Sequence, residues 1–357
     1  MMRLGSFRYL APTSVGEVVK VLRAEGPQAS PFAGGTDLVP NMKRRQQLPR
    51  TLVALRRVEG LREVVSGKGG LTLGAGLTLT ATAARREVPA AQRALGMAAG
   101  KVATPHIRNM GTLGGNLCLD TRCNYYDQNY EWRQAISFCK KAPGPEGVAV
   151  TEPGKTVCWV APSSPRCWAV SSSDTAPALV ALGAEVTLVS ADGERRIPLE
   201  QLYRNDGMAY LTKARDELLT AVHLPTPAEG ARSTYWKLRR RGSFDFPVLA
   251  VAAAGVVDRD GTARALRVVL GAVESCPLLL DTSELLGQQL TDERLGAFAD
   301  KAVRPARPLD NTDFALSWRK KVVREYLIGA LKELRGDDPA RLGLLARSAA
   351  RLLPVAV

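Results

Sequence analysis

The first 57 residues alternate between short apolar runs and one amphipathic segment. From residue 14 to 25, apolar side chains recur at helical spacing, and Ser14 and Glu17 have the spacing of a capping box. A Gly-Pro pair then ends the predicted helix. Short apolar runs predict strands at 7–10, 30–33 and 51–55. This order favours a small parallel sheet, so we expect an N-terminal α/β lobe over 1–57.

The middle of the chain mixes short strands with helical segments. Helical periodicity covers 90–102 and 176–182, and a glycine-rich stretch at 104–116 predicts a loop. Apolar runs predict strands at 71–73, 77–79, 184–189, 194–197 and 218–224. We therefore expect a second domain over 58–225.

The region after residue 225 begins with a Pro- and Gly-containing linker at 226–230. Two apolar runs flank an Asp-Arg-Asp-Gly turn and predict a hairpin, and Thr291 caps the first of two predicted helices. The predicted elements are strands at 247–257 and 265–273 and helices at 291–303 and 314–334. We expect a C-terminal three-stranded sheet with helices over 226–335. An extension over 336–357 follows, in which 342–353 is compatible with a final helix.

Composition narrows the function classes. The chain carries 49 Lys and Arg against 35 Asp and Glu, a net charge of +14. Charged side chains scattered over a solvated surface explain this charge most simply. Binding of an acidic electron-carrier protein is the next explanation. Binding of nucleic acid is disfavoured because no nucleic-acid-binding motif accompanies the charge. Two histidines exclude a multi-histidine metal site. No apolar run reaches membrane-spanning length, and the N-terminal residues lack a signal-peptide core, so we expect a cytoplasmic protein.

Cysteine usage is the sharpest compositional feature. Five of the six cysteines fall between residues 118 and 167, in the pattern C-x4-C-x15-C-x18-C-x8-C. A disulfide framework fits poorly because nothing marks the chain as secreted. The spacings are wider than the knuckles of structural zinc sites, whereas an iron–sulfur cluster accepts irregular spacing. Spacing alone favours iron–sulfur, with zinc and inert thiols as alternatives. Cys276 lies apart and is expected to be a buried hydrophobe.

Two glycine-containing segments are candidate anion sites. The first includes Gly34, Gly35 and Thr36, whose backbone N–H groups could face one concavity, although a simple tight turn is the more common explanation of a bare glycine pair. Asp37 is expected to cap the following turn. The second segment has its glycines, Thr112 and Asn116 near its end. Two such segments in one domain suggest an extended ligand with a central diphosphate.

Together these motifs resemble the FAD-binding medium subunit of the molybdenum hydroxylase (xanthine dehydrogenase) family. The resemblance rests on a glycine pair with Thr36, on the T-P-x-I-R-N-x-G-T-x-G-G-N segment at 104–116, and on Ser173-Asp174-x4-Leu179. It spans about residues 5 to 335. It implies an α+β chain with a vanillyl-alcohol-oxidase/PCMH-type FAD-binding fold, made of a small α/β lobe, an antiparallel-sheet lobe and a C-terminal α+β domain.

The resemblance also implies which residues contact FAD. Backbone donors of the two segments would hold the diphosphate, Asp174 would accept a hydrogen bond from the cofactor, and Lys237 would place a cation near the flavin or its diphosphate. The implied contacts are Ala33, Gly34, Gly35, Thr36, Asp37, Leu38, Thr104, Gly111, Thr112, Gly114, Gly115, Asn116, Asp174 and Lys237. His106 is expected to be a locally bonded histidine, with a flavin contact as the alternative.

A long insertion at about 117–172 carries the clustered cysteines. It resembles the insertion of the β subunit of 4-hydroxybenzoyl-CoA reductase, which holds a [4Fe–4S] cluster, and such an insertion also occurs in a periplasmic aldehyde oxidoreductase of the family. The resemblance implies four ligands, Cys123, Cys139, Cys158 and Cys167, with Cys118 as a spare. The run between Cys139 and Cys158 is longer here, which departs from that pattern.

The function implied is electron transfer among an external carrier, the cluster, FAD and partner [2Fe–2S] clusters. The implied partners are a molybdenum-cofactor large subunit and a small subunit with two [2Fe–2S] clusters, as a dimer of heterotrimers, and a ferredoxin-type carrier. A 4-hydroxybenzoyl-CoA reductase-like enzyme is the first expectation. An aldehyde or N-heterocycle dehydrogenase is the alternative, and a cluster-stabilised assembly protein is a rival of another class. No nucleic acid or membrane is expected to bind.

Overall fold

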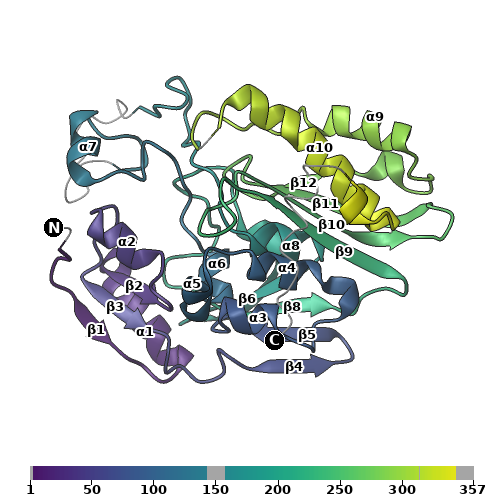
Figure 1. Cartoon of the computed structure of the whole chain (residues 1–357). Helices are drawn as coiled ribbons and strands as arrows, with labels where there is room; N and C mark the ends of the chain where they lie inside the picture. The colour runs from purple at the N-terminus through teal and green to yellow at the C-terminus, as the bar shows by residue number, and fades with distance from the viewer. Residues whose placement is uncertain (1–2, 143–156, 313, 343–357) are drawn as a thin grey trace.

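The computed structural model describes residues 3–142, 157–312 and 314–342, and its three β-sheets follow one another along the chain (Figure 1). The first sheet is parallel, in the order β1-β3-β2. Its strands are β1 (Arg8–Leu10), β2 (Ala29–Phe32) and β3 (Thr51–Ala54). Between β1 and β2 lies α1 (Val15–Glu25), which begins at the predicted capping box: the Ser14 hydroxyl accepts from the Glu17 N–H at 3.2 Å. The parallel N-terminal sheet is thus confirmed.

The second sheet has five strands in the order β4-β5-β8-β6-β7, and all of its pairs are antiparallel. Its strands are β4 (Val64–Gly67), β5 (Gly70–Gly74), β6 (Glu185–Ser190), β7 (Gly193–Pro198) and β8 (Leu218–Pro225). The helices α4 (Ala94–Gly100) and α8 (Thr175–Ala181) belong to its core, because their alanine and leucine side chains are fully buried with those of the strands. Along the chain, the cysteine-bearing segment (about 117–172) therefore lies between β5 and β6 of this sheet.

The third sheet is antiparallel, in the order β12-β11-β10-β9. Its strands are β9 (Ala231–Leu238), β10 (Leu249–Val257), β11 (Ala263–Gly271) and β12 (Leu278–Leu280). One face packs on α9 (Asp292–Ala302) and α10 (Leu316–Arg335), whereas the other face meets α8 and α4 (Figure 1). Side chains along β10 point alternately to the two faces of the sheet. Val251 packs in the same core as α10, and the neighbouring Ala250 packs in the core of the second sheet. Helices therefore connect the second and third sheets through one continuous core.

Hydrogen bonds join the cysteine-bearing segment to the first lobe and to the C-terminal region. Its helix α7 (Tyr130–Ala135) carries the buried Arg133, which donates to the carbonyl of Arg44 at the end of α2 (Leu38–Lys43), 2.5 Å away. The backbone N–H of Asn124 donates to the carbonyl of Asn311 at 2.8 Å, before α10. The segment is thus tied to the first lobe and to the C-terminal region.

Three expectations about local structure were wrong. Instead of a strand at 77–79, α3 (Leu79–Ala83) begins there because the Thr78 hydroxyl accepts from the N–H of Ala81. The glycine-rich stretch expected as a loop contains α5 (Pro105–Met110) and α6 (Leu113–Leu117), capped by Thr104 and Thr112. The C-terminal sheet has four strands rather than three, since the short β12 extends its edge.

The domain boundaries at 57, 225 and 335 stay predictions, although the three sheets lie within 8–54, 64–225 and 231–280. The helix considered at 342–353 lies almost wholly outside the described residues. In the part of the chain that the structure describes, no helix is long and apolar enough to cross a membrane.

Candidate cofactor cavity and cysteine cavity

A cavity of about 1060 Å³, here called the large cavity, is lined by residues from the first lobe, the second domain and the stretch before β10. This volume lies just above the roughly 300–1,000 Å³ of most small-molecule sites, as a long ligand requires. Most of the residues expected to contact FAD line it, and two do not: Thr104 and Lys237. The predicted residues that line it are Ala33, Gly34, Gly35, Thr36, Asp37, Leu38, Gly111, Thr112, Gly114, Gly115, Asn116 and Asp174.

The first glycine segment presents free backbone donors to the large cavity. The N–H groups of Gly34, Gly35 and Thr36 have no hydrogen-bond acceptor among the described residues, and all three residues line the cavity. Consecutive unpaired N–H groups form an anion-binding concavity. Gly35 adopts φ +68, a left-handed conformation that glycine tolerates and that most other residues do not. The donor set of this segment therefore fits a diphosphate.

The second glycine segment differs from expectation, because its glycine donors are already used within the protein. The Gly111 N–H donates to the Ile107 carbonyl at 2.7 Å, and the Gly114 N–H donates to the Ala75 carbonyl at 2.8 Å. The Gly115 N–H donates to the Thr112 hydroxyl at 3.1 Å, which caps α6. These three N–H groups therefore have partners within the protein, whereas their residues line the large cavity, so a contact of this segment with the diphosphate stays a prediction.

The two glycine segments also touch each other. A Cβ at Gly34 would clash with the backbone carbonyl of Met110 and would lie 2.9 Å from the nitrogen of Gly111. A Cβ at Gly114 would lie 2.8 Å from the Cβ of Ala75. At these two positions glycine is required for backbone packing around the cavity, independently of any ligand.

Asn116 joins the second glycine segment to the Ser173-Asp174 motif. Its side-chain oxygen accepts from the Ser173 hydroxyl at 2.9 Å, the Thr175 N–H at 3.1 Å and the Thr175 hydroxyl at 2.7 Å. Asn116 is buried, so these donors would lose their only good acceptor if the amide were removed. Its local role is to fix Asp174 at the wall of the large cavity.

A second, small cavity, here called the cysteine cavity, is lined by all four predicted ligands, Cys123, Cys139, Cys158 and Cys167. Each of these residues is buried, with 5 to 8% of its surface exposed, and none forms a disulfide. Cys123 lines both cavities, so the two share a wall. Cys118 lines the large cavity and not the cysteine cavity.

The thiols of the cysteine cavity are close enough to interact but are not arranged around a single ion. Among the described residues, no group of three or more His, Cys, Asp or Glu side chains is placed to hold one metal ion. The free volume of the cavity is about 10 Å³, roughly that of one water molecule. Burial raises the pKa of Cys123 to about 12 and of Cys167 to about 11. Backbone N–H groups oppose this rise, including that of Ala169, 3.4 Å from the Cys167 Sγ.

Comparison with known proteins identifies the family. The family described as the FAD binding domain in molybdopterin dehydrogenase matches residues 5–227. The chain belongs to this family. The FAD-binding subunit of the aldehyde oxidoreductase of Escherichia coli (strain K12) is 31% identical over 309 residues, covering 85% of this chain and 92% of that protein. The medium chain of carbon monoxide dehydrogenase from Hydrogenophaga pseudoflava is 27% identical, covering 91% and 96%.

Solved structures agree with this assignment at the level of the fold. A carbon monoxide dehydrogenase chain from Oligotropha carboxidovorans superposes with a TM-score of 0.74 at 24% identity, over 94% of this chain and all of that one. A quinoline 2-oxidoreductase chain from Pseudomonas putida 86 gives 0.70 at 22%, over 93% and 98%. The expected α+β FAD-binding fold is confirmed, and the chain is an FAD-binding subunit of a molybdenum hydroxylase-family oxidoreductase.

Within this FAD-binding subunit, Asp174 is held by two residues of β9. The Tyr235 hydroxyl donates to one carboxylate oxygen at 2.6 Å, and the Lys237 ammonium donates to the other at 2.8 Å. Lys237 is buried and also donates to the Lys101 carbonyl at 3.0 Å. Burial lowers the pKa of Lys237, and Asp174 opposes that shift. Lys237 does not line the large cavity, so it can affect the cavity only through its ion pair with Asp174.

Asp37 does not cap α2, contrary to expectation. It occupies the N-cap position, but its side chain makes no capping hydrogen bond. Its carboxylate instead forms an ion pair with the buried Arg122 and accepts from the Asn41 amide at 3.1 Å. Arg122 also binds Asp127, 3.1 Å away, and lines the large cavity next to Cys123. Arg122, which belongs to the cysteine-bearing segment, thus neutralises the negative charge of Asp37 beside the predicted diphosphate site.

The sequence did not point to several residues that build these walls. Tyr235 lies two positions before Lys237 on the same face of a strand, a spacing that could have linked them. Lys141, two residues after Cys139, carried no signal of its partner Asp120, because that pairing depends on how the segment folds back. His106 is exposed on α5 and lies outside both cavities, and Cys276 is half-buried in the C-terminal region.

Proposed function

We propose that this chain is an electron-transfer flavoprotein subunit that carries FAD in the large cavity and a [4Fe–4S] cluster in the cysteine cavity. One observation carries the proposal: four buried, unpaired thiols line a cavity that shares Cys123 with the cavity lined by the glycine segments. When bound, FAD supplies one- and two-electron chemistry and the cluster supplies one-electron transfer. The shared wall supports the proposal, because FAD and the cluster would then lie next to each other.

On the flavin side, the chain's own residues would bind and orient the cofactor. The free N–H groups of Gly34, Gly35 and Thr36 are the proposed diphosphate donors. Asp174, fixed by Tyr235 and Lys237, is the proposed acceptor for a polar group of the cofactor. Thr104 would contribute indirectly, because its hydroxyl caps α5, which leads into Gly111.

On the iron–sulfur side, the chemistry of the donor set supports the assignment. Four thiols match the ligand count of a [4Fe–4S] cluster, in which each thiolate binds a different iron, so the sulfurs lie farther apart than around one ion. Backbone N–H groups beside three of the thiols favour the thiolate, as they do around clusters, and the three are Cys123, Cys139 and Cys167. The small free volume means that the side chains must swing outward to admit the cluster.

Metal analysis of ligand variants tests the cluster. In the anaerobically purified complex, Cys139→Ser and Cys158→Ser should each remove about four iron atoms per chain while FAD stays bound. Cys276→Ser is the matched control and should keep the wild-type iron content, because Cys276 does not line the cysteine cavity. Unchanged iron in the first two variants, or zinc in place of iron, would refute the assignment.

The same proposal includes partner chains. Relatives of this chain are named as FAD-binding subunits or medium chains, which supports a role inside a larger enzyme. We propose a molybdenum-cofactor large subunit and a small subunit with two [2Fe–2S] clusters, assembled as a dimer of heterotrimers, with an acidic ferredoxin-type carrier as the external partner. The net charge of +14 supports an acidic carrier. Electron delivery by that carrier should then slow strongly as salt is raised.

For the substrate, the comparisons favour aldehyde or N-heterocycle oxidation over reduction of an aromatic CoA thioester. The relative at 31% identity is the FAD-binding subunit of an aldehyde oxidoreductase, and another relative belongs to a nicotinate dehydrogenase. Neither name refers to a CoA thioester. Assays of the purified complex decide the question: we expect reduction of an artificial acceptor with aldehydes or N-heterocycles. Turnover of 4-hydroxybenzoyl-CoA with a low-potential donor, and of neither other class, would reverse this choice.

A further inference from the structure

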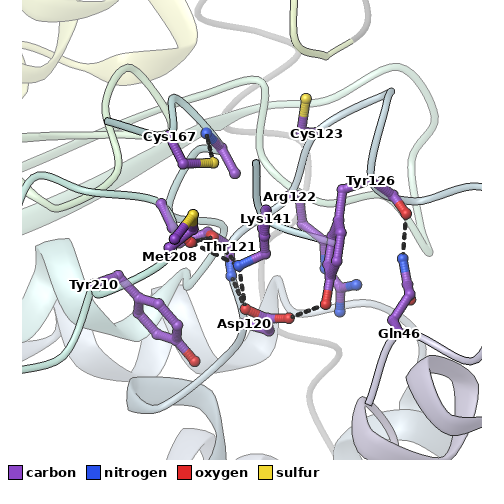
Figure 2. Close-up of polar contacts among 12 residues, drawn as sticks. Gln46, Asp120, Thr121, Arg122, Cys123, Tyr126, Lys141, Cys167, Met208 and Tyr210 are labelled. Atoms are coloured by element: carbon purple, nitrogen blue, oxygen red, sulfur yellow. Dashed lines mark hydrogen bonds and ion pairs between the residues drawn. The ribbon is translucent and has the colours of Figure 1, made fainter. Parts of the chain in front are cut away.

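The buried side chain of Lys141 lies between Asp120 and the two cysteines Cys123 and Cys167 (Figure 2). Lys141 lines the cysteine cavity, yet its ammonium points away from it and forms an ion pair with Asp120 at 2.7 Å. Asp120 lines the large cavity. Both side chains are 6% exposed, so the pair is shielded from solvent and from salt. The ion pair therefore spans the wall between the two cavities.

Further contacts hold this lysine in place. Its ammonium donates to the Thr121 hydroxyl at 2.8 Å and to the Gly207 carbonyl at 2.6 Å, so all three of its donors are used. It lies 4.8 Å from the ring centre of Tyr126 and 5.4 Å from that of Tyr210. The Tyr126 hydroxyl donates to the second oxygen of Asp120 at 3.0 Å, and Tyr126 itself lines the cysteine cavity. A buried charge fixed by this many contacts keeps one position.

The charge of Lys141 acts on the thiols. Lys141 is two residues after Cys139 and lines the cavity together with all four thiols, while its side chain is only 6% exposed. A buried cation beside the four sulfurs favours the more negative oxidation state of a centre that they hold, because reduction adds one electron and one unit of negative charge.

We propose that Lys141 is a positioning residue that raises the reduction potential of the metal centre held by the four cysteines, with Asp120 as its counter-charge facing the flavin cavity. The inference rests on the proposed function, since it needs a redox centre in the cysteine cavity. It adds to that function opposite effects of two residues on the reduction potential of the centre. The lysine makes the centre easier to reduce, and the aspartate limits this effect and holds the lysine in the shared wall.

The test is a redox titration of the centre in the anaerobically purified complex, followed by electron paramagnetic resonance. Lys141→Gln removes the charge but keeps an amide donor. We expect it to lower the ratio of reduced to oxidised centre at fixed potential about tenfold, a fall in midpoint potential of about 59 mV for a one-electron couple. Asp120→Asn removes the counter-charge and should shift the midpoint the opposite way. Iron and FAD content are measured for every variant.

Lys140→Gln is the matched control, one residue earlier on the same cavity. Its ammonium donates to the carbonyls of Ser164 and Pro165 at the half-buried edge of the segment, so solvent screens its charge and the shift should be clearly smaller. A shift in Lys141→Gln no larger than in Lys140→Gln, or shifts of equal sign in Lys141→Gln and Asp120→Asn, would overturn the proposal.

Two further outcomes are also decisive. If Lys141→Gln loses iron, the titration of Asp120→Asn decides between the two roles of the lysine. A raised midpoint potential in Asp120→Asn supports the electrostatic role. An unchanged or lowered midpoint potential, or loss of iron in this variant as well, overturns the proposal in favour of a purely structural role. A wild-type complex whose iron content is the same as that of Cys139→Ser overturns the proposed cluster itself, and the metal analysis reveals this before any variant is titrated.

Discussion

Arg122 and Asp37 form an ion pair that connects the cysteine-bearing segment to the first glycine segment. Arg122 is 7% exposed in its side chain and immediately precedes Cys123, which lines both cavities. Asp37 immediately follows the three residues whose N–H groups are free for a diphosphate. One ion pair thus links the geometry of the proposed cluster site to the charge at the proposed flavin site.

This ion pair predicts a charge-dependent effect on FAD affinity. In Arg122→Met the carboxylate of Asp37 is left unpaired beside the diphosphate, so the dissociation constant of FAD should rise about tenfold or more, about 1.4 kcal/mol. The double variant Asp37→Asn/Arg122→Met removes the repulsive charge as well and should recover most of the affinity. Fluorescence titration with FAD measures both. A double variant as weak as Arg122→Met would contradict the electrostatic explanation.

The close approach of the two glycine segments predicts a steric effect at Gly34. In Gly34→Ala the new methyl group clashes with the Met110 carbonyl, a backbone group that cannot move aside without shifting α5. We expect a loss of about 1–3 kcal/mol in unfolding free energy and a lower FAD content. Gly16→Ala is the matched control: nothing lies within 4 Å of its Cβ, and it sits inside α1. That variant should be neutral or more stable by up to about 1 kcal/mol.

The buried pair of Lys237 and Asp174 predicts a strong dependence of stability on its partner. The two side chains are 1% and 3% exposed. In Lys237→Met the buried carboxylate loses its counter-charge, which should lower the unfolding free energy by about 3–5 kcal/mol. In the double variant Lys237→Met/Asp174→Asn no unpaired charge remains, so stability should be partly restored while FAD affinity stays reduced. Urea unfolding measures the first effect, and equal loss in both variants would argue against it.

Lys101 predicts a pH effect with a definite sign. Its ammonium donates to the Tyr235 carbonyl at 3.2 Å, and burial lowers its pKa from 10.5 to about 8. The folded state therefore binds fewer protons than the unfolded state between about pH 8 and 10.5, and the contribution of Lys101 to stability rises with pH across that window. Below pH 8 the charged lysine costs about 3 kcal/mol relative to pH 10.5.

Lys101→Met isolates this effect from cysteines and tyrosines that titrate in the same range. The difference in unfolding free energy, wild type minus Lys101→Met, should increase from pH 8 to 10.5. Urea unfolding at a series of pH values gives this difference directly. A difference that is flat with pH would show that Lys101 keeps its usual pKa in the folded chain.

The sequence predicted the features that local patterns encode. The capping box at Ser14 and the two main hairpins follow from the spacing of a few neighbouring residues, and the structure has them. The family resemblance, rather than a local pattern, singled out the four cysteines that line one cavity and Asp174 at the wall of the other, and their roles as ligands stay predictions.

What the sequence could not predict depends on contacts between distant segments. The glycine segment at 104–116 was expected to be a donor loop, but the N–H of Gly114 donates to the carbonyl of Ala75, which comes from another part of the chain. Asp37 looked like a helix cap because its partner, Arg122, is 85 positions away. Lys141 and Asp120 meet only because the cysteine-bearing segment folds back on itself.

The most direct test of the central claim is anomalous X-ray scattering at the iron edge from crystals of the complex grown without oxygen. We predict a compact multi-iron peak inside the cysteine cavity, surrounded by the sulfurs of Cys123, Cys139, Cys158 and Cys167, with FAD density along Gly34 and Gly35. FAD density with no iron peak in that cavity, or with a peak at the zinc edge instead, would contradict the account.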